Sequence, residues 1–289
     1  MSTSFTQDGT ARAQVRRAAR SVVTRFGTLS SGLRLSPRFI VAGAQRCATT
    51  SLYRMLSEHP QVSPPMLNKG VHYFDTAERY ALGPAFYNGH FPLRLPWRHA
   101  LVTGEASPYY IFHPLAIARI ATDLPTTHVI VLLRDPVERA FSAYKQESRR
   151  GFETLPSFEQ ALDAEEHRLA GEESRLEANP MYHSFAHQHF GYVARGRYTH
   201  QLRRAEAHLG KQRLTIIDLG ALIGGDLGIW DRLLENIGLD PWRPENMIRA
   251  NAAPSTDMRT ATRERLEAVF AQENADLAAY LGYTQSWCL

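Results

Sequence analysis

The chain has 289 residues, of which 44% are hydrophobic and 21% charged, a balance typical of a globular protein with a sizeable core. Its formal net charge of +4 suits an anionic ligand but falls far below the dense positive charge of a dedicated nucleic-acid binder. The sequence shows neither a membrane-spanning apolar run nor a secretory signal, and Cys47 and Cys288 form no disulfide framework and no metal-ligand spacing. We therefore expect a cytoplasmic protein that does not bind nucleic acid.

Residues 1–35 differ in character from the rest of the chain. Arginines stand among Ala, Val and Phe, and no acidic residue follows Asp8 within this stretch. One interpretation is a poorly ordered extension, and the other is a basic amphipathic helix that rests weakly on an acidic or membrane surface. We favour the first. The arginines concerned are Arg12, Arg16, Arg17, Arg20 and Arg25.

Residues 36–289 read as one α/β domain. Apolar runs alternate with helical patterns, which predicts a central, mostly parallel sheet flanked by helices. The first strand is expected at 39–42, and a loop and a helix with apolar residues at helical spacing follow it. Further strands are expected at 100–103, 128–133 and 213–218, and a last helix at 260–281 with Gly282 as its stop.

Three other segments have a distinctive composition. Residues 70–97 are rich in aromatic rings, which is typical of either a satellite hydrophobic cluster or the wall of a substrate cleft. Residues 157–178 are rich in acids, which predicts a solvent-facing helical surface. His183 and His187 have helical spacing, but Ser184 stands where a zinc-protease motif requires glutamate, so we expect no metal there.

Two turns join a buried strand to a helix, and each carries an arginine and hydroxyl groups. One runs over 43–51 and the other over 134–142. In a parallel sheet both lie at the carboxyl edge, where free N–H groups and helix dipoles favour anions. A Mg-nucleotide loop would need Gly and Lys where Ala48 and Thr49 stand, and a metal-binding acid is expected where Arg134 stands. The pattern therefore favours a ligand with two phosphate-like groups and no metal.

These motifs resemble those of sulfotransferases that use 3′-phosphoadenosine 5′-phosphosulfate (PAPS). Gly43-Ala-Gln-Arg-Cys-Ala-Thr-Thr-Ser-Leu is similar to their P-loop-like 5′-phosphosulfate loop, and Val131-Leu-Leu-Arg-Asp-Pro-Val-Glu-Arg-Ala-Phe-Ser-Ala-Tyr144 to their 3′-phosphate motif. Lys69-Gly-Val-His-Tyr-Phe-Asp75, Gly104-Glu-Ala-Ser-Pro-Tyr-Tyr110 and Arg195-Gly-Arg-Tyr198 resemble bacterial members related to heparan-sulfate sulfotransferases.

The resemblance implies a role for each matching residue. Arg46 would bridge the leaving phosphate and the sulfuryl oxygens, and Arg134 with Ser142 would hold the 3′-phosphate. Backbone N–H groups of residues 47–51 and the hydroxyls at the helix start would cradle the phosphosulfate. No metal is implied. The other donor-binding positions are Cys47, Ala48, Thr49, Thr50, Ser51 and Tyr198.

The sequence also departs from the family pattern. Ala48 replaces a loop glycine, Gly70 stands where heparan-type enzymes have a glutamate base, and Ala106 stands where animal members have lysine. Two replacement bases are available. His72 is the better general base on chemical grounds but can equally be a packed core histidine, and Glu105 is either a base or a group that holds a loop.

We therefore predict a PAPS-dependent sulfotransferase that acts on a hydroxyl of a carbohydrate or another small-molecule acceptor, by an in-line transfer in which the enzyme positions the groups and stabilises charge. Two alternatives stay open. One is a Mg-ATP-dependent P-loop kinase. The other is a non-enzymatic protein that binds anions or a membrane surface through its basic N-terminus.

Overall fold

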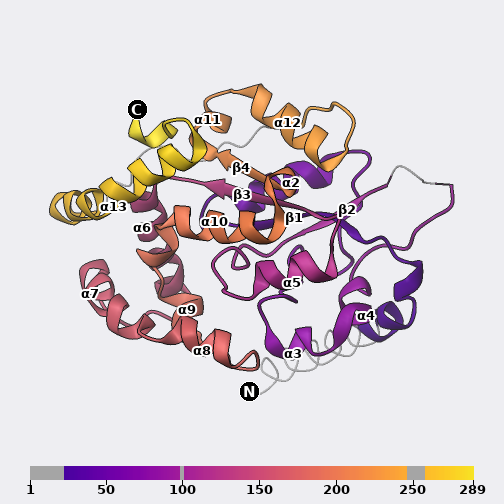
Figure 1. The fold of residues 1–289 in the computed structure, drawn as a ribbon, viewed down its shortest axis with the longest axis horizontal. Helices are drawn as coiled ribbons and strands as arrows, with labels where there is room; N and C mark the ends of the chain where they lie inside the picture. The colour runs from indigo at the N-terminus through magenta and orange to yellow at the C-terminus, as the bar shows by residue number, and fades with distance from the viewer. Residues whose placement is uncertain (1–22, 98–100, 246–257) are drawn as a thin grey trace, which may run out of the picture.

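A parallel sheet forms the centre of the protein (Figure 1). The structure is a computed structural model that describes residues 23–97, 101–245 and 258–289. Within these ranges the sheet has four strands in the order β2-β1-β3-β4, and every neighbouring pair is parallel. The predicted α/β fold is confirmed. The strands are β1 (Pro37–Gly43), β2 (Thr103–Ala106), β3 (His128–Leu133) and β4 (Leu214–Asp218).

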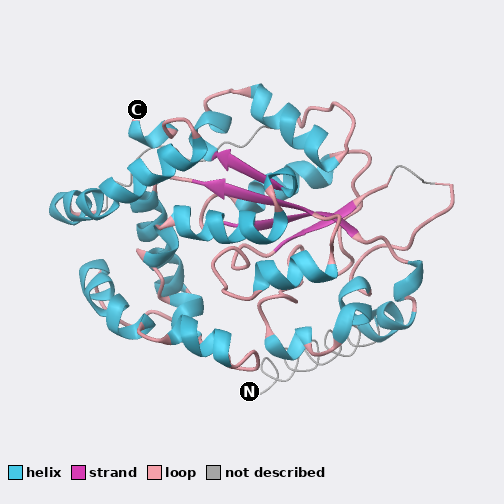
Figure 2. Ribbon diagram, viewed as in Figure 1, coloured by secondary structure: helices cyan, strands magenta, loops and turns pink. Residues whose placement is uncertain are grey.

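The inner strands are apolar because both of their faces are covered. Every residue of β3 is buried, and only Arg38 of β1 is exposed. Such strands read as continuous apolar runs, not as alternating patterns. Helices lie on both sides of the sheet (Figure 2). α5 (Ala116–Asp123) and α10 (Tyr198–Leu209) pack against each other on one side.

On the other side, α2 (Thr49–Glu58) lies close to α12 (Leu227–Ile237). His59 at the end of α2 bonds through Nε2 to the carbonyl of Asp240, at 3.0 Å. The remaining elements are α3 (Ala77–Tyr80), α4 (Gly83–Asn88), α8 (Glu172–Ala178), α9 (Phe185–His189), α11 (Leu219–Ile223), and the 3₁₀ turns η1 (Ser31–Leu33), η2 (Ala194–Gly196), η3 (Lys211–Arg213) and η4 (Ser286–Cys288).

A second apolar cluster stabilises the region beyond the sheet. It joins α6 (Pro136–Arg149), α7 (Phe158–Leu169) and α13 (Thr260–Leu281), and it includes Phe141 and Phe270. The predicted last helix is confirmed. The predicted solvent-facing surface over 157–178 is wrong for Glu165, which is buried and accepts hydrogen bonds from the N–H groups of Val193 and Ala194, at 2.7 and 2.8 Å.

The second strand was predicted at 100–103; a strand is present, but its bounds are shifted toward the C-terminus and overlap the prediction at Thr103, and Ala100 lies outside the described residues. β2 begins at Thr103 and includes Gly104 and Glu105, residues that do not suggest a buried strand. Gly104 is needed there because a Cβ atom would lie 2.5 Å from the ring of Phe39 on β1. Glu105 is tolerated because its carboxylate is fully hydrogen-bonded inside the protein, as described below.

The predicted N-terminal extension lies mostly outside the described residues, since the structure describes only residues from 23 onward. Arg34 is buried and donates to the carbonyls of Phe91 and Gly27, at 2.5 and 3.2 Å. The described end of the extension therefore packs on the domain, and a boundary at residue 35 stays a prediction. None of the described helices combines the length and the apolar character of a membrane span.

Candidate active site

The two arginine-bearing turns lie side by side. β1 pairs with β2 on one side and with β3 on the other. The chain therefore changes direction across the sheet between β1 and β3. In open α/β sheets, ligands bind in the crevice at the carboxyl ends of such strands. The turns that follow β1 and β3 thus meet at the position where the sequence predicts an anion site.

Arg46 joins the two turns directly. Its Nε donates to Oγ of Ser142 on α6, at 3.0 Å. Burial lowers the pKa of Arg46, and so does the positive charge of Arg149 and Arg134. Among the described residues no carboxylate lies within ion-pair distance of Arg46. A partly buried cation beside other positive charges is stabilised by an anionic ligand.

The start of α2 supplies N–H donors to the same place. Cys47 and Ser51 donate their N–H groups to the carbonyls of Ala44 and Ala48, at 3.1 and 2.9 Å. The described residues offer no acceptor to the N–H groups of Ala48, Thr49 and Thr50 at the positive end of the helix. Of the five N–H groups predicted to cradle the phosphosulfate, those of residues 48–50 are therefore the ones that can still donate to a ligand.

Ala48 adopts the left-handed conformation, with φ 55° and ψ 23°. Glycine reaches this region without strain, whereas a residue with a Cβ atom pays about 1 kcal/mol. The backbone geometry thus accounts for the glycine of similar loops, and Ala48 retains the same backbone path.

Tyr198 contacts both turns through its buried hydroxyl group. It is 3% exposed, its hydroxyl donates to the carbonyl of Arg134 at 2.8 Å, and it lies 3.8 Å from Sγ of Cys47. Burial raises the pKa of both Tyr198 and Cys47. Arg134 itself is partly exposed and has Glu138 Oε2 at 3.7 Å from its Nη2. Donor binding by these residues stays a prediction, with Tyr198 and Cys47 placed as supports of the loop.

A cleft of about 600 Å³ opens beside the first turn. It is bounded by the loop after β1, the segment before α3, the end of β2, and helices α6 and α9. The described residues that line it include no carboxylate and are Gln45, Asn68, Lys69, Gly70, His72, Arg79, Ala106, Pro108, Tyr109, Gln146, Arg150, Gln188 and His189.

His72 lines this cleft and is held by a carboxylate. Its Nδ1 lies 2.8 Å from Oδ2 of Asp75, and its side chain is 41% exposed. An ionised carboxylate only accepts, so Nδ1 carries the hydrogen and Nε2 keeps its lone pair. Burial lowers the pKa of His72, but the hydrogen bond and charge of Asp75 outweigh it and leave the pKa above the ordinary histidine value.

Glu105 lies behind the cleft wall and has no exposed surface. It accepts hydrogen bonds from the N–H of Val71 and the hydroxyls of Tyr87, Ser107 and Tyr110, at 2.8, 2.8, 2.7 and 3.1 Å. Burial raises its pKa. These contacts favour the alternative in which Glu105 holds a loop, because they fix the segment that carries His72.

Gly70 is explained by the same packing. A Cβ atom at this position would lie 2.6 Å from the carbonyl oxygen of Ala106 and 3.1 Å from Oγ of Ser107. The backbone therefore approaches β2 too closely for any side chain. A glutamate base is excluded from this position for a steric reason as long as the segment keeps its path.

No role was predicted for three groups that the fold brings to the site, although all three lie in motifs that resemble the family. Asp75 was recognisable three residues after His72. Lys69 donates through Nζ to Oγ1 of Thr50 at the start of α2. Arg195 is buried and donates to the side chain of Gln45 and to the carbonyls of His187 and Gln188. Lys69 and Arg195 stand in the family-like motifs of the sequence, but their contacts with Thr50 and Gln45 join separate elements, so spacing did not predict those contacts.

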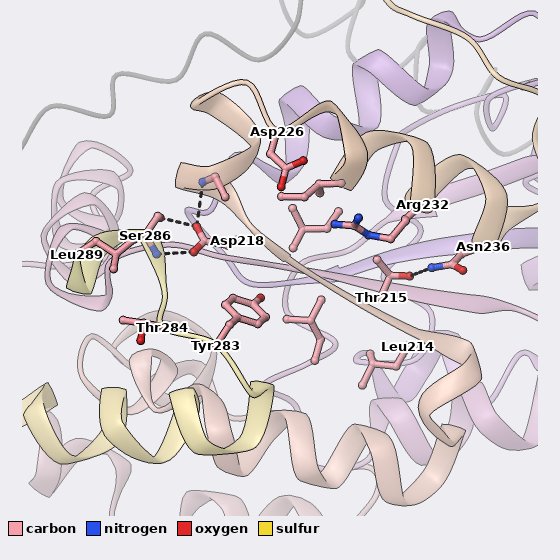
Figure 3. A pocket seen from close by; sticks show the side chains of 14 residues that line it. Leu214, Thr215, Asp218, Asp226, Arg232, Asn236, Tyr283, Thr284, Ser286 and Leu289 are labelled. Carbon is pink, nitrogen blue, oxygen red and sulfur yellow. Dashed lines mark hydrogen bonds between the residues drawn. The ribbon is translucent and has the colours of Figure 1, made fainter.

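A second cavity lies apart from this site, whereas His187 contacts Tyr109, which lines the cleft. A cavity of about 490 Å³ runs beside β4, α12 and residues 283–289, where Asp218 accepts hydrogen bonds from Ser286 (Figure 3). None of the predicted site residues lines it. His187 is buried and lies 2.7 Å through Nδ1 from the hydroxyl of Tyr109. Over the described ranges, no cluster of three or more His, Cys, Asp or Glu residues forms a metal site.

Comparison with known proteins agrees with the motifs. A segment of 108 residues is 39% identical to the membrane-associated sulfotransferase kil1 of Dictyostelium discoideum, over 37% of this chain and 22% of that protein. Another, of 132 residues, is 35% identical to heparan sulfate glucosamine 3-O-sulfotransferase 3A1 of Mus musculus, over 45% of this chain and 31% of that protein. No family model matches the chain.

The crystal structure of a sulfotransferase from Alicyclobacillus acidocaldarius has the same fold. It superposes with a TM-score of 0.66 and 28% identity, over 87% of this chain and 98% of that one. The chain is a homologue of sulfotransferases. Its recognition as a relative of the heparan-sulfate type is confirmed. The matches to the two curated relatives span less than a third of their length, at 22% and 31%.

Proposed function

We propose that this sulfotransferase homologue transfers a sulfuryl group from PAPS to a hydroxyl of a carbohydrate or another small-molecule acceptor, without a metal. The observation that carries the proposal is the bond between Arg46 and Ser142, which joins the two predicted phosphate-binding turns in one site. Arg46 and the free N–H groups of α2 suit the phosphosulfate, and Arg134 with Ser142 suits the 3′-phosphate.

The cleft beside the loop supports a polyhydroxylated acceptor. Four carboxamides line it, and their NH₂ groups can donate to hydroxyl groups, whereas three of their oxygens already accept hydrogen bonds within the protein (Gln45, Asn68, Gln146 and Gln188). Tyr109 and Pro108 add flat apolar surface. Lys69 and Arg150 give the cleft positive charge, which suits an acceptor that carries acidic groups. Heparan sulfate, which the name of the mouse relative contains, is therefore the first acceptor to try.

His72 is proposed as the general base. Nε2 of the tautomer bonded to Asp75 takes the proton from the hydroxyl group of the sulfate acceptor. The carboxylate of Asp75 then stabilises the imidazolium that forms. Arg46 cannot give up a proton at neutral pH, so its contribution is to stabilise the charge that develops on the leaving phosphate. A raised pKa makes His72 a stronger base but keeps it protonated to a higher pH.

A transfer assay tests the proposal. The protein is incubated with ³⁵S-labelled PAPS and desulfated, partly sulfated and neutral oligosaccharides, in buffer with EDTA. We expect label on a glycan, and a His72→Ala variant that binds the donor but transfers about 100-fold more slowly. Phosphate transfer from Mg-ATP with no sulfate transfer from PAPS would favour the kinase alternative and reject the proposal.

A further inference from the structure

Lys69 occupies the boundary between the donor loop and the acceptor cleft. It lines the cleft together with His72, and its ammonium group donates to Oγ1 of Thr50 at the start of α2. Arg46, by contrast, points through Nε toward α6 and Ser142. The two cations therefore approach the first turn from different elements, one from the loop itself and one from the segment that also carries His72.

The backbone around Lys69 is fixed, so its side chain is aimed by the fold. The carbonyl of Lys69 accepts from the N–H of Ala106 at the end of β2, at 2.8 Å. Gly70 packs against the carbonyl of Ala106 too closely for a Cβ atom, and the N–H of His72 donates to Oγ of Ser107, at 3.1 Å. Lys69 and His72 thus extend from one short segment that is bonded to Ala106 at the end of β2 and to Ser107 after it.

The charge of Lys69 is not neutralised within the described protein. None of the described carboxylates forms an ion pair with it. Burial lowers the pKa of Lys69, and so does the nearby positive charge of Arg54. A half-buried cation with a single hydroxyl partner gains stability when an anionic group replaces that hydroxyl.

We propose that Lys69 is a catalytic residue of the sulfuryl transfer, one that binds an oxygen of the transferring group on the side that faces the acceptor. This inference rests on the proposed function. In the step, the acceptor oxygen forms a bond to sulfur while the bond from sulfur to the 5′-phosphate oxygen breaks. The electron pair of that bond stays on the phosphate oxygen, and the acceptor proton goes to Nε2 of His72. Lys69 compensates the charge that spreads over the sulfuryl oxygens.

The test separates binding from transfer. Lys69→Met is compared with wild type and with Lys211→Met, a control whose lysine is 84% exposed and pairs with Glu206 on the surface. We expect kcat to fall about 100-fold in Lys69→Met, with the affinity for 3′-phosphoadenosine 5′-phosphate, which lacks the sulfuryl group, changed less than about threefold. The control keeps the wild-type kcat.

A chemical rescue keeps the proposal testable if Lys69→Met folds poorly. Lys69→Cys is made in a Cys288→Ser background, because Cys288 is exposed and Cys47 is buried. Treatment with bromoethylamine rebuilds a lysine-like side chain at position 69. We expect the treated Lys69→Cys protein to have a kcat at least tenfold higher than the same protein before treatment.

The proposal is overturned if Lys69→Met transfers sulfate within threefold of the wild-type kcat. It is equally overturned if the affinity for 3′-phosphoadenosine 5′-phosphate falls as much as kcat, because Lys69 would then only hold the donor. Both results presuppose a wild-type enzyme that transfers sulfate. A wild-type protein that transfers none rejects the proposed function itself, and this outcome is distinct from the other two.

Discussion

The donor turns and the acceptor cleft are both positively charged, but their charges are held differently. On the donor side, Arg46 and Lys69 have hydroxyl partners and no carboxylate within ion-pair distance in the described chain, and only Arg134 among the donor residues discussed has a carboxylate, that of Glu138, at 3.7 Å. On the acceptor side, His72 is bonded to Asp75, and both His189 and Arg150 lie against Glu147, at 2.9 and 3.7 Å. Unpaired cations attract a strongly anionic ligand, whereas paired ones are oriented groups that discriminate geometry and handle protons.

The largest effect is expected from removing an unpaired donor-side cation. Arg46→Met should lower kcat/KM for PAPS about 1,000-fold, because Arg46 faces the charge that develops on the leaving phosphate. The matched control is Arg243→Met, since Arg243 is an exposed arginine paired with Asp231 away from the site. Steady-state kinetics on both variants decides. If Arg46→Met and Arg243→Met had the same kcat/KM, an unpaired cation at the site would matter no more than a paired one on the surface, and the comparison would be wrong.

The buried carboxylate of Glu105, beside the acceptor cleft, should matter for the stability of the protein. Glu105→Ala leaves the donors of Val71, Tyr87, Ser107 and Tyr110 buried without an acceptor, which should cost about 3 kcal/mol of unfolding free energy. Urea unfolding measures the loss, with the exposed Glu264→Ala as control. A variant with wild-type stability but no transfer would instead indicate that Glu105 is the base.

A smaller effect is expected when the orientation of His72 is disturbed. Asp75→Asn removes the charge that raises the pKa of His72 and should lower the plateau kcat roughly 30-fold. Because His72 must be neutral to accept a proton, wild-type kcat should rise with pH through the raised pKa. In Asp75→Asn this rise should move to lower pH. A pH profile whose midpoint does not move would exclude His72 as the titrating base.

The smallest effect is expected in the loop backbone. Ala48→Gly relieves the left-handed strain at φ 55°, but it adds backbone freedom to the unfolded chain. We expect a net gain of up to about 1 kcal/mol and unchanged donor affinity. Ala143→Gly, inside α6, should instead lose about 1 kcal/mol. Thermal unfolding of both variants compares them, and a destabilised Ala48→Gly would contradict the strain argument.

The donor turns and the acceptor cleft also differ in how well the sequence predicts them. The donor turns are local, since a strand, an arginine and the hydroxyls of a helix start follow within a few residues, and these features predicted 43–51 and 134–142. The bond between Arg46 and Ser142 required the strand order, which places β1 beside β3. Spacing alone could not supply that order.

The acceptor cleft was far less predictable because distant segments build it. Glu105 looked like a candidate base, and only its hydrogen-bond partners, Tyr87 and Tyr110 among them, show that it is enclosed. β2 was misplaced for the related reason that a glycine and a glutamate fit a buried strand only when Phe39 and those tyrosines surround them. Tertiary contacts overrode local propensity at these positions.

The central claim is that the paired turns bind a nucleotide with two separate phosphate groups and need no metal. Thermal unfolding with saturating 3′-phosphoadenosine 5′-phosphate in EDTA tests it most directly, on wild type and on Arg134→Ala. At about 100 times Kd we expect wild type to gain roughly 5 °C, and Arg134→Ala to gain almost nothing. Stabilisation only by ATP together with Mg²⁺, or an equal gain in Arg134→Ala, would contradict the account.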